Sequence, residues 1–160
     1  MNLIPLACFF TGHRVMEDFE KSAILPRLEK SILDMIENDV KVFICGGALG
    51  FDTLAAETVL KLKKSYDITL CLYLPCPDQT YDWQEEDVEV YNRILASADE
   101  VLYTSQKSRS PHLMKKRNMA MVEASDYCIC YLKNPKSGTG QTVRMAEEKG
   151  IEVINLFKNM

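Results

Sequence analysis

The segment VKVFICGGALGFD, residues 40–52, decides the fold of this chain. Its first six residues are apolar or β-branched with one exception, a composition typical of a strand buried on both faces of a parallel sheet. Glycines follow, and from about residue 52 to 64 the apolar residues recur at helical spacing. A buried strand that runs through a glycine loop into a helix is the repeating unit of α/β proteins.

The same alternation extends outward in both directions. Further strands are predicted at residues 6–10, 68–74, 100–103, 126–132 and 152–156. A first helix is predicted from the spacing of Leu25, Leu28, Ile32, Met35 and Ile36, with Pro26 limiting how early it begins.

The remaining helices are predicted from residues that are typical of helix ends. Asp82, with Glu85 three residues on, forms a capping-box pattern that predicts the start of a third helix. Ser110-Pro111 is typical of the start of a fourth, and Gly150 of the end of a fifth. Residues 1–160 therefore form a single domain, a doubly wound, mostly parallel six-stranded sheet with helices on both faces, which is Rossmann-like. Such a sheet binds its ligand at the carboxyl ends of the strands.

The composition argues against several classes of protein. The apolar and charged fractions, 47% and 26%, are those of a globular domain, and a net charge of -4 argues against a general nucleic-acid binder. No segment is long enough to span a bilayer. The apolar start up to Phe10 lacks a basic leader and carries Pro5, which favours a strand over a signal peptide. We therefore expect a cytoplasmic protein without membrane contact.

The six cysteines are expected to behave as small apolar side chains in a reducing compartment, since most lie within or at the end of strand-like runs. With two histidines and no paired cysteine spacing, neither a metal site nor a bound cofactor is predicted.

Two glycine loops carry the predicted chemistry. Gly46, Gly47 and Gly50 permit positive φ angles and close approach of a ligand, and the following helix offers free N–H groups to an anion. Asp52 caps that helix or binds a ribose hydroxyl or an amine. Residues 137–140, Ser-Gly-Thr-Gly, repeat this arrangement and suit phosphate or ribose oxygens. The alternatives are a tight turn for the first loop and a plain helix cap for the second.

Other polar residues follow the strands as well. Arg14 is placed to pair with phosphate through two hydrogen bonds, and His13 to donate to phosphate, to act in acid–base chemistry or simply to pack. Trp83 either stacks on a base or packs at the start of the third helix. The basic run Lys115-Lys116-Arg117 is expected to be a solvated helix face.

These motifs, in this order, resemble the SLOG superfamily, and within it the small YpsA-like (YoqJ-like) proteins. The matching pieces are residues 11–14, TGHR; 46–52, GGALGFD; Ala55 to Glu57; Gln79 and Trp83; Arg117-Asn118 with Met121; Ser125-Asp126; and Gly138-Thr139 with Thr142. The resemblance implies a Rossmann-like fold that recognises nucleotides or nucleotide-derived small molecules. Its relatives include cytokinin-activating phosphoribohydrolases, DprA-type DNA-binding proteins and nucleoside deoxyribosyltransferases. The ligand contacts that it implies are Gly12, Arg14, Gly46, Gly47, Gly50, Asp52, Gly138 and Thr139. His13, Gln79 and Ser137 complete the set of predicted ligand-binding residues.

One departure from the pattern concerns mechanism. The hydrolase and transferase relatives place a catalytic glutamate where this chain has Thr142, and a hydroxyl does not replace a carboxylate in N-glycosidic cleavage. Asp52 and Asp126 are the candidate substitutes.

Three functions follow as hypotheses. The first is binding or sensing of a nucleotide or NAD-derived small molecule. The alternative is an N-glycosidic hydrolase or transferase acting on a nucleoside monophosphate. The weakest is nucleic-acid binding through the basic run of residues 115–117, which the acidic composition disfavours. A homo-oligomer is an open alternative, because related folds often dimerise.

Overall fold

The computed structural model describes residues 4–159, which build one six-stranded sheet in the order β4-β3-β2-β1-β5-β6. Every neighbouring pair of strands is parallel. The strands are β1 Leu6–Gly12, β2 Val40–Cys45, β3 Thr69–Leu74, β4 Glu100–Tyr103, β5 Tyr127–Tyr131 and β6 Glu152–Asn155. The helices are α1 Asp18–Glu37, α2 Phe51–Leu62, α3 Glu85–Ser97, α4 Pro111–Ala124 and α5 Gly138–Lys149, followed by the 3₁₀ turn η1 Leu156–Asn159.

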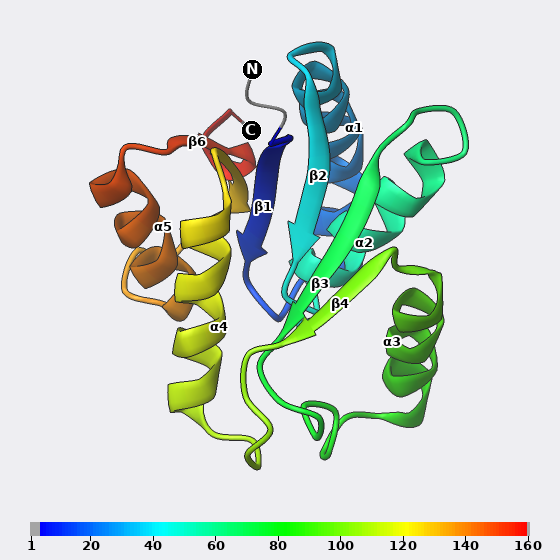
Figure 1. Ribbon diagram of the computed structural model, residues 1–160, viewed down its shortest axis with the longest axis vertical. Coiled ribbons are helices and arrows are strands. Elements are labelled where there is room, and N and C mark those ends of the chain that lie inside the picture. The colour runs from blue at the N-terminus through cyan, green and yellow to red at the C-terminus, as the bar shows by residue number, and fades with distance from the viewer. Residues whose placement is uncertain (1–3, 160) are drawn as a thin grey trace.

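The helices form two layers on the sheet: α1, α2 and α3 cover one face, and α4 and α5 cover the other (Figure 1). Successive strand residues point to opposite faces, so Phe9 packs under α4 and α5 while Phe10 packs under the other layer. The predicted doubly wound fold is confirmed, with a sheet that is parallel throughout. Strand order reverses at β1, which lies between β2 and β5, and a crevice is expected at its carboxyl end.

The first helix differs from the prediction. It begins at Asp18 and contains Pro26, which lies on its exposed face, where water can reach the carbonyl that the ring leaves unpaired. The capping box of this helix is formed by Glu17 and Glu20. Leu25, expected on the buried stripe, is 38% exposed, whereas Glu20 faces inward.

The third helix also begins later than predicted, at Glu85. Asp82 does not cap it, because its carboxylate accepts a hydrogen bond from Arg109 at 2.5 Å instead. The predicted ends at Ser110-Pro111 and at Gly150, which has a φ of 87°, are confirmed.

All six cysteines are buried and free, in agreement with their predicted role as small apolar side chains. None of the helices within residues 4–159 has the length and apolar character needed to cross a bilayer.

Candidate functional site

A cleft of about 620 Å³ opens at the carboxyl edge of the sheet, where strand order reverses. Its walls come from the residues that follow β1, β2, β3 and β5 and from one side of α4. Of the predicted ligand contacts, six line it: Gly12, Arg14, Asp52, Gln79, Gly138 and Thr139. The fold thus brings both predicted loops to a single cavity, of a size typical of small-molecule sites.

The glycines of the first loop support the cleft from behind rather than line it. Gly47 and Gly50 have the predicted positive φ angles, 72° and 76°. Gly46 does not, and its lack of a side chain has another reason: a Cβ there would lie 2.6 Å from Nη1 of Arg117. A Cβ on Gly50 would lie 2.4 Å from the carbonyl oxygen of Arg14. These glycines allow the loop to pack against residues that do reach the cleft.

Ser137 acts as a helix cap. Its hydroxyl accepts a hydrogen bond from the Gly140 N–H at 3.1 Å and donates to the Asn134 carbonyl at 2.6 Å, so both its functions are used within the chain. Thr142, at the position of the relatives' glutamate, is 1% exposed and donates to the Gly138 carbonyl. Phosphate contacts at this loop would therefore come from the backbone at Gly138 and from Thr139.

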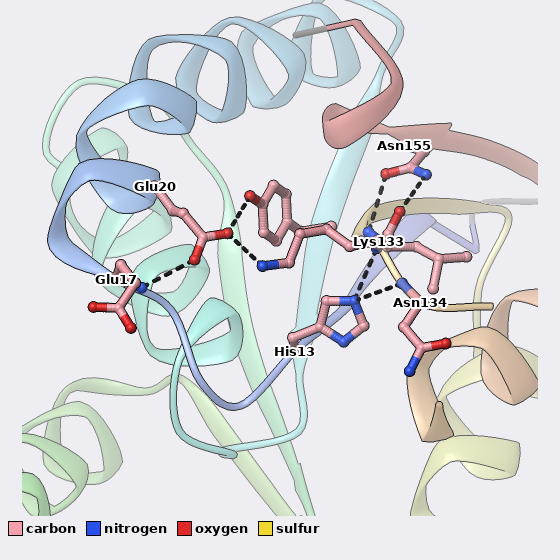
Figure 2. Close-up of polar contacts among 8 residues, drawn as sticks. His13, Glu17, Glu20, Lys133, Asn134 and Asn155 are labelled. Carbon is pink, nitrogen blue, oxygen red and sulfur yellow. Dashed lines mark hydrogen bonds and ion pairs between the residues drawn. The ribbon is translucent and has the colours of Figure 1, made fainter. Parts of the chain in front are cut away.

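His13 lies outside the cleft and holds the loop after β5 in place (Figure 2). Its Nε2 accepts hydrogen bonds from the backbone N–H groups of Lys133, at 2.8 Å, and Asn134, at 3.3 Å. Burial, with help from the charge of Lys133, lowers the pKa of His13 and favours the neutral ring that these contacts need. The structure thus supports the packing alternative, because the ring lies outside the cleft and its Nε2 binds two backbone N–H groups.

Glu20 anchors α1 beside His13. Its carboxylate accepts hydrogen bonds from Tyr131 Oη at 2.6 Å and Lys133 Nζ at 2.7 Å, and from the Glu17 N–H at 3.1 Å (Figure 2). Lys133, followed by Tyr131, contributes most to lowering the pKa of Glu20 to about 2. The carboxylate therefore contributes stability that is fully present above pH 4.5 and is lost as the pH falls towards 2.

We expect Glu20→Gln to lower the free energy of unfolding at pH 7 by on the order of 2 kcal/mol, because the hydroxyl of Tyr131 and the partly exposed ammonium of Lys133 lose their charged acceptor. The difference from wild type should shrink as the pH approaches 2, which urea unfolding at several pH values would measure. Asp18→Asn, which changes an exposed acidic residue in the same helical turn, serves as the control and should change stability by less than about 1 kcal/mol. A pH-independent loss in Glu20→Gln would contradict this assignment.

Asp126 is not a candidate for catalysis. It precedes β5, at the amino edge of the sheet, and its carboxylate accepts a hydrogen bond from the Ala7 N–H at 2.9 Å. The cleft lies at the opposite edge, so this alternative is wrong on position alone.

Arg117 is the central cleft residue that sequence reasoning misplaced. Although it belongs to a basic run, it is 5% exposed, whereas Lys115 and Lys116 are exposed. Its Nε donates to Asn118 Oδ1 at 2.8 Å, and its Nη1 donates to the Gly46 carbonyl. Helical spacing was the available signal, because Leu113, Arg117 and Met121 recur every four residues and all three are buried.

The buried charge of Arg117 has no ion-pair partner within residues 4–159. Asp52, 5% exposed, is the nearby carboxylate that influences it, and burial raises the pKa of Asp52 to about 6 against the opposing effect of Arg117. Arg14, Arg109 and Lys115 also line the cleft. Arg109 is paired with Asp82, so three cations without an ion pair among residues 4–159 face the Asp52 carboxylate, which gives the cavity a net positive charge.

Comparison with known proteins identifies the family. The profile of the YspA SLOG family matches residues 8–154. A UPF0398 protein of Bacillus cereus strain B4264 is 30% identical over 148 residues, covering 91% of this chain and 78% of that protein. A UPF0398 protein of Bacillus thuringiensis strain Al Hakam is 29% identical over 152 residues, covering 94% and 80%.

The fold also resembles solved structures of DNA processing protein A. The protein from Helicobacter pylori, solved to describe its single-stranded DNA binding mode, superposes with a TM-score of 0.67 at 20% identity, covering 93% of this chain and 64% of that one. The protein from Streptococcus pneumoniae superposes with a TM-score of 0.69 at 18% identity, covering 93% and 49%. This chain therefore spans about half to two thirds of those chains, and the likeness is one of fold.

Proposed function

Because this chain belongs to the YspA SLOG family, we propose that its cleft binds a nucleotide or a nucleotide-derived small molecule. The observation that carries the proposal is the guanidinium of Arg117, which is buried at the cleft and forms no ion pair among residues 4–159. Burial of a charged group destabilises a fold, and the attraction of the more distant Asp52 offsets only part of this cost. An anionic ligand would neutralise the guanidinium and offset this loss of stability.

The remaining cleft residues fit a phosphate-bearing ligand. The first turn of α5, at Gly138 and Thr139, presents backbone N–H groups and the positive end of the helix dipole to the cavity. Arg14 follows β1 at the same edge and adds a second guanidinium. The phosphate would lie between these groups, with the sugar and base extending along the cleft.

A thermal-shift panel tests the proposal directly. Purified full-length protein is heated with NAD, ADP-ribose, cyclic dinucleotides and nucleoside monophosphates, each in turn. A ligand present at 100 times its dissociation constant should stabilise the fold by about 2.7 kcal/mol. If none of these compounds raises the melting temperature of ligand-free protein, the proposal is wrong.

Gly138→Ala should separate binding from stability. A Cβ at this position would meet no atom of residues 4–159 within 4 Å, and its φ is not positive, so the fold tolerates alanine. We expect equal stability or a gain of up to about 1 kcal/mol, because alanine restricts the unfolded chain. The added methyl group would occupy the space in front of the α5 amides, so calorimetry should show nucleotide affinity reduced about tenfold or more. Unchanged affinity would place the phosphate elsewhere.

Asp52 supports a second candidate, cleavage of an N-glycosidic bond. Its carboxylate lines the cleft and accepts a hydrogen bond from the Ala48 N–H at 3.3 Å, and a pKa of about 6 suits a general base at neutral pH. Incubation with nucleoside monophosphates and chromatography for released base would test it. Base release that Asp52→Asn abolishes would establish the enzyme, whereas tight binding without release would leave a binding protein.

A further inference from the structure

Gln79 presents a buried polar atom that the protein itself leaves unused. The side chain lies in the loop between β3 and α3, borders the cleft, and is 2% exposed. Its carbonyl oxygen Oε1 is buried and has no hydrogen-bond partner within residues 4–159. Buried carbonyl oxygens in native proteins are nearly always paired, so one beside an open cleft points to a partner that is a ligand.

The local packing accommodates this carboxamide. Gly47 has a φ of 72°, and a Cβ on it would lie 3.4 Å from Gln79 Oε1 and 2.5 Å from Leu74. The absence of a side chain at this turn therefore leaves room for the Gln79 carboxamide against the glycine loop.

Its position relative to the proposed phosphate site matches the length of a nucleotide. Gln79 follows β3, whereas Gly138 and Thr139 follow β5, and the sheet order places β2 and β1 between those two strands. Three strand spacings amount to about 14 Å. A ligand with its phosphate at α5 would therefore bring its base towards Gln79.

We propose that Gln79 determines the specificity of the cleft by accepting a hydrogen bond from the exocyclic amino group of the ligand's base. A carboxamide pairs through both of its halves with the N6 amino donor and the N7 acceptor of adenine, whereas guanine and hypoxanthine present two acceptors on that edge. The ligand class is thus an adenine nucleotide. This inference rests on the proposed function, because it assumes that the phosphate lies at α5.

Calorimetric titration of the full chain with AMP, IMP and ribose 5-phosphate tests it. IMP has the size and charge of AMP, but it carries a carbonyl oxygen where AMP has the amino group. Its O6 and N7 atoms are therefore both acceptors, and in either orientation the carboxamide can pair with only one of them. We expect AMP to bind about tenfold more tightly than IMP. Gln79→Leu should bring the two affinities within about twofold and leave the affinity for ribose 5-phosphate unchanged.

Gln141→Leu is the matched control, because it makes the same substitution in another residue of the cleft wall, on α5, and should preserve the preference for AMP. Equal binding of AMP and IMP by the wild type, or an AMP preference that survives Gln79→Leu, would overturn the inference and leave the phosphate site standing. Failure of AMP and ribose 5-phosphate alike to bind would also overturn the inference, and together with a negative thermal-shift panel it would remove the proposed function.

Discussion

Replacing Arg117 by methionine is expected to lower nucleotide affinity by about 100-fold while leaving the ligand-free fold at least as stable as the wild type. Loss of one partner from a desolvated charge pair costs about 2–5 kcal/mol in binding. In the ligand-free protein the same substitution removes a buried cation that no carboxylate within residues 4–159 pairs with. Exchange of a buried ion pair for apolar side chains of similar volume is often neutral or stabilising, and removal of Arg117 breaks no ion pair among residues 4–159.

The substitution has two local effects on the ligand-free protein. The Gly46 carbonyl loses its donor, which offsets part of the gain in stability. Asp52 loses the positive charge that lowers its pKa, so it binds a proton more readily, and the protonated carboxyl is compatible with its buried position. Calorimetry measures the change in nucleotide affinity, and urea unfolding measures the change in stability of the ligand-free protein.

Lys116→Met is the matched control for this experiment. It removes one positive charge from the same helix, one residue away, but Lys116 is exposed and lies outside the cleft lining. We expect its affinity to stay within about threefold of wild type, since isolated surface charges contribute little. Equal losses in both variants would show that net charge, rather than the buried guanidinium, governs binding.

The difference in burial between Arg117 and its exposed neighbours, Lys115 and Lys116, was not predicted from the sequence. Three consecutive basic residues read as a solvated face, yet consecutive helical positions point in different directions. Only the inward one meets Gly46, 71 residues earlier in the chain. A contact of that separation leaves no local pattern, although the family motif did single out Arg117-Asn118.

Strands and loop positions were predictable for the opposite reason, because their signals are local. Apolar runs, the glycines after β2 and the Ser110-Pro111 start each depend on a few adjacent residues. The start of α1 also had a local signal, the capping box of Glu17 and Glu20, but the burial of Glu20 involves Tyr131, 111 residues away. For the glycines and Ser137 the sequence left two readings open, ligand contact and a turn or helix cap, and the packing of the glycines and the cap at Ser137 are seen in the structure.

Gly50→Ala is expected to lower the free energy of unfolding by about 3 kcal/mol or more. Gly50 has φ 76° and ψ −118°, a conformation that residues with a Cβ adopt at a cost of about 1–3 kcal/mol. The new Cβ would in addition lie 2.4 Å from the carbonyl oxygen of Arg14 and 2.5 Å from that of His13, which are backbone atoms of the loop leading into the cleft. Relief requires movement of that loop, and with it the hydrogen bond from the Phe51 N–H to the His13 carbonyl, 3.1 Å long.

Gly150→Ala isolates the contribution of the steric clash. Gly150 also has a positive φ, 87°, but a Cβ on it would meet no atom of residues 4–159 within 4 Å. Alanine there is destabilising only through the left-handed conformation, by about 1–2 kcal/mol. Urea unfolding of both variants should therefore give a clearly larger loss for Gly50→Ala, and calorimetry should show weaker nucleotide binding for that variant alone, because Arg14 moves with its backbone. Equal losses in the two variants would mean that the loops after β1 and β2 are not packed against each other, and the cleft built on their contact would not form as described.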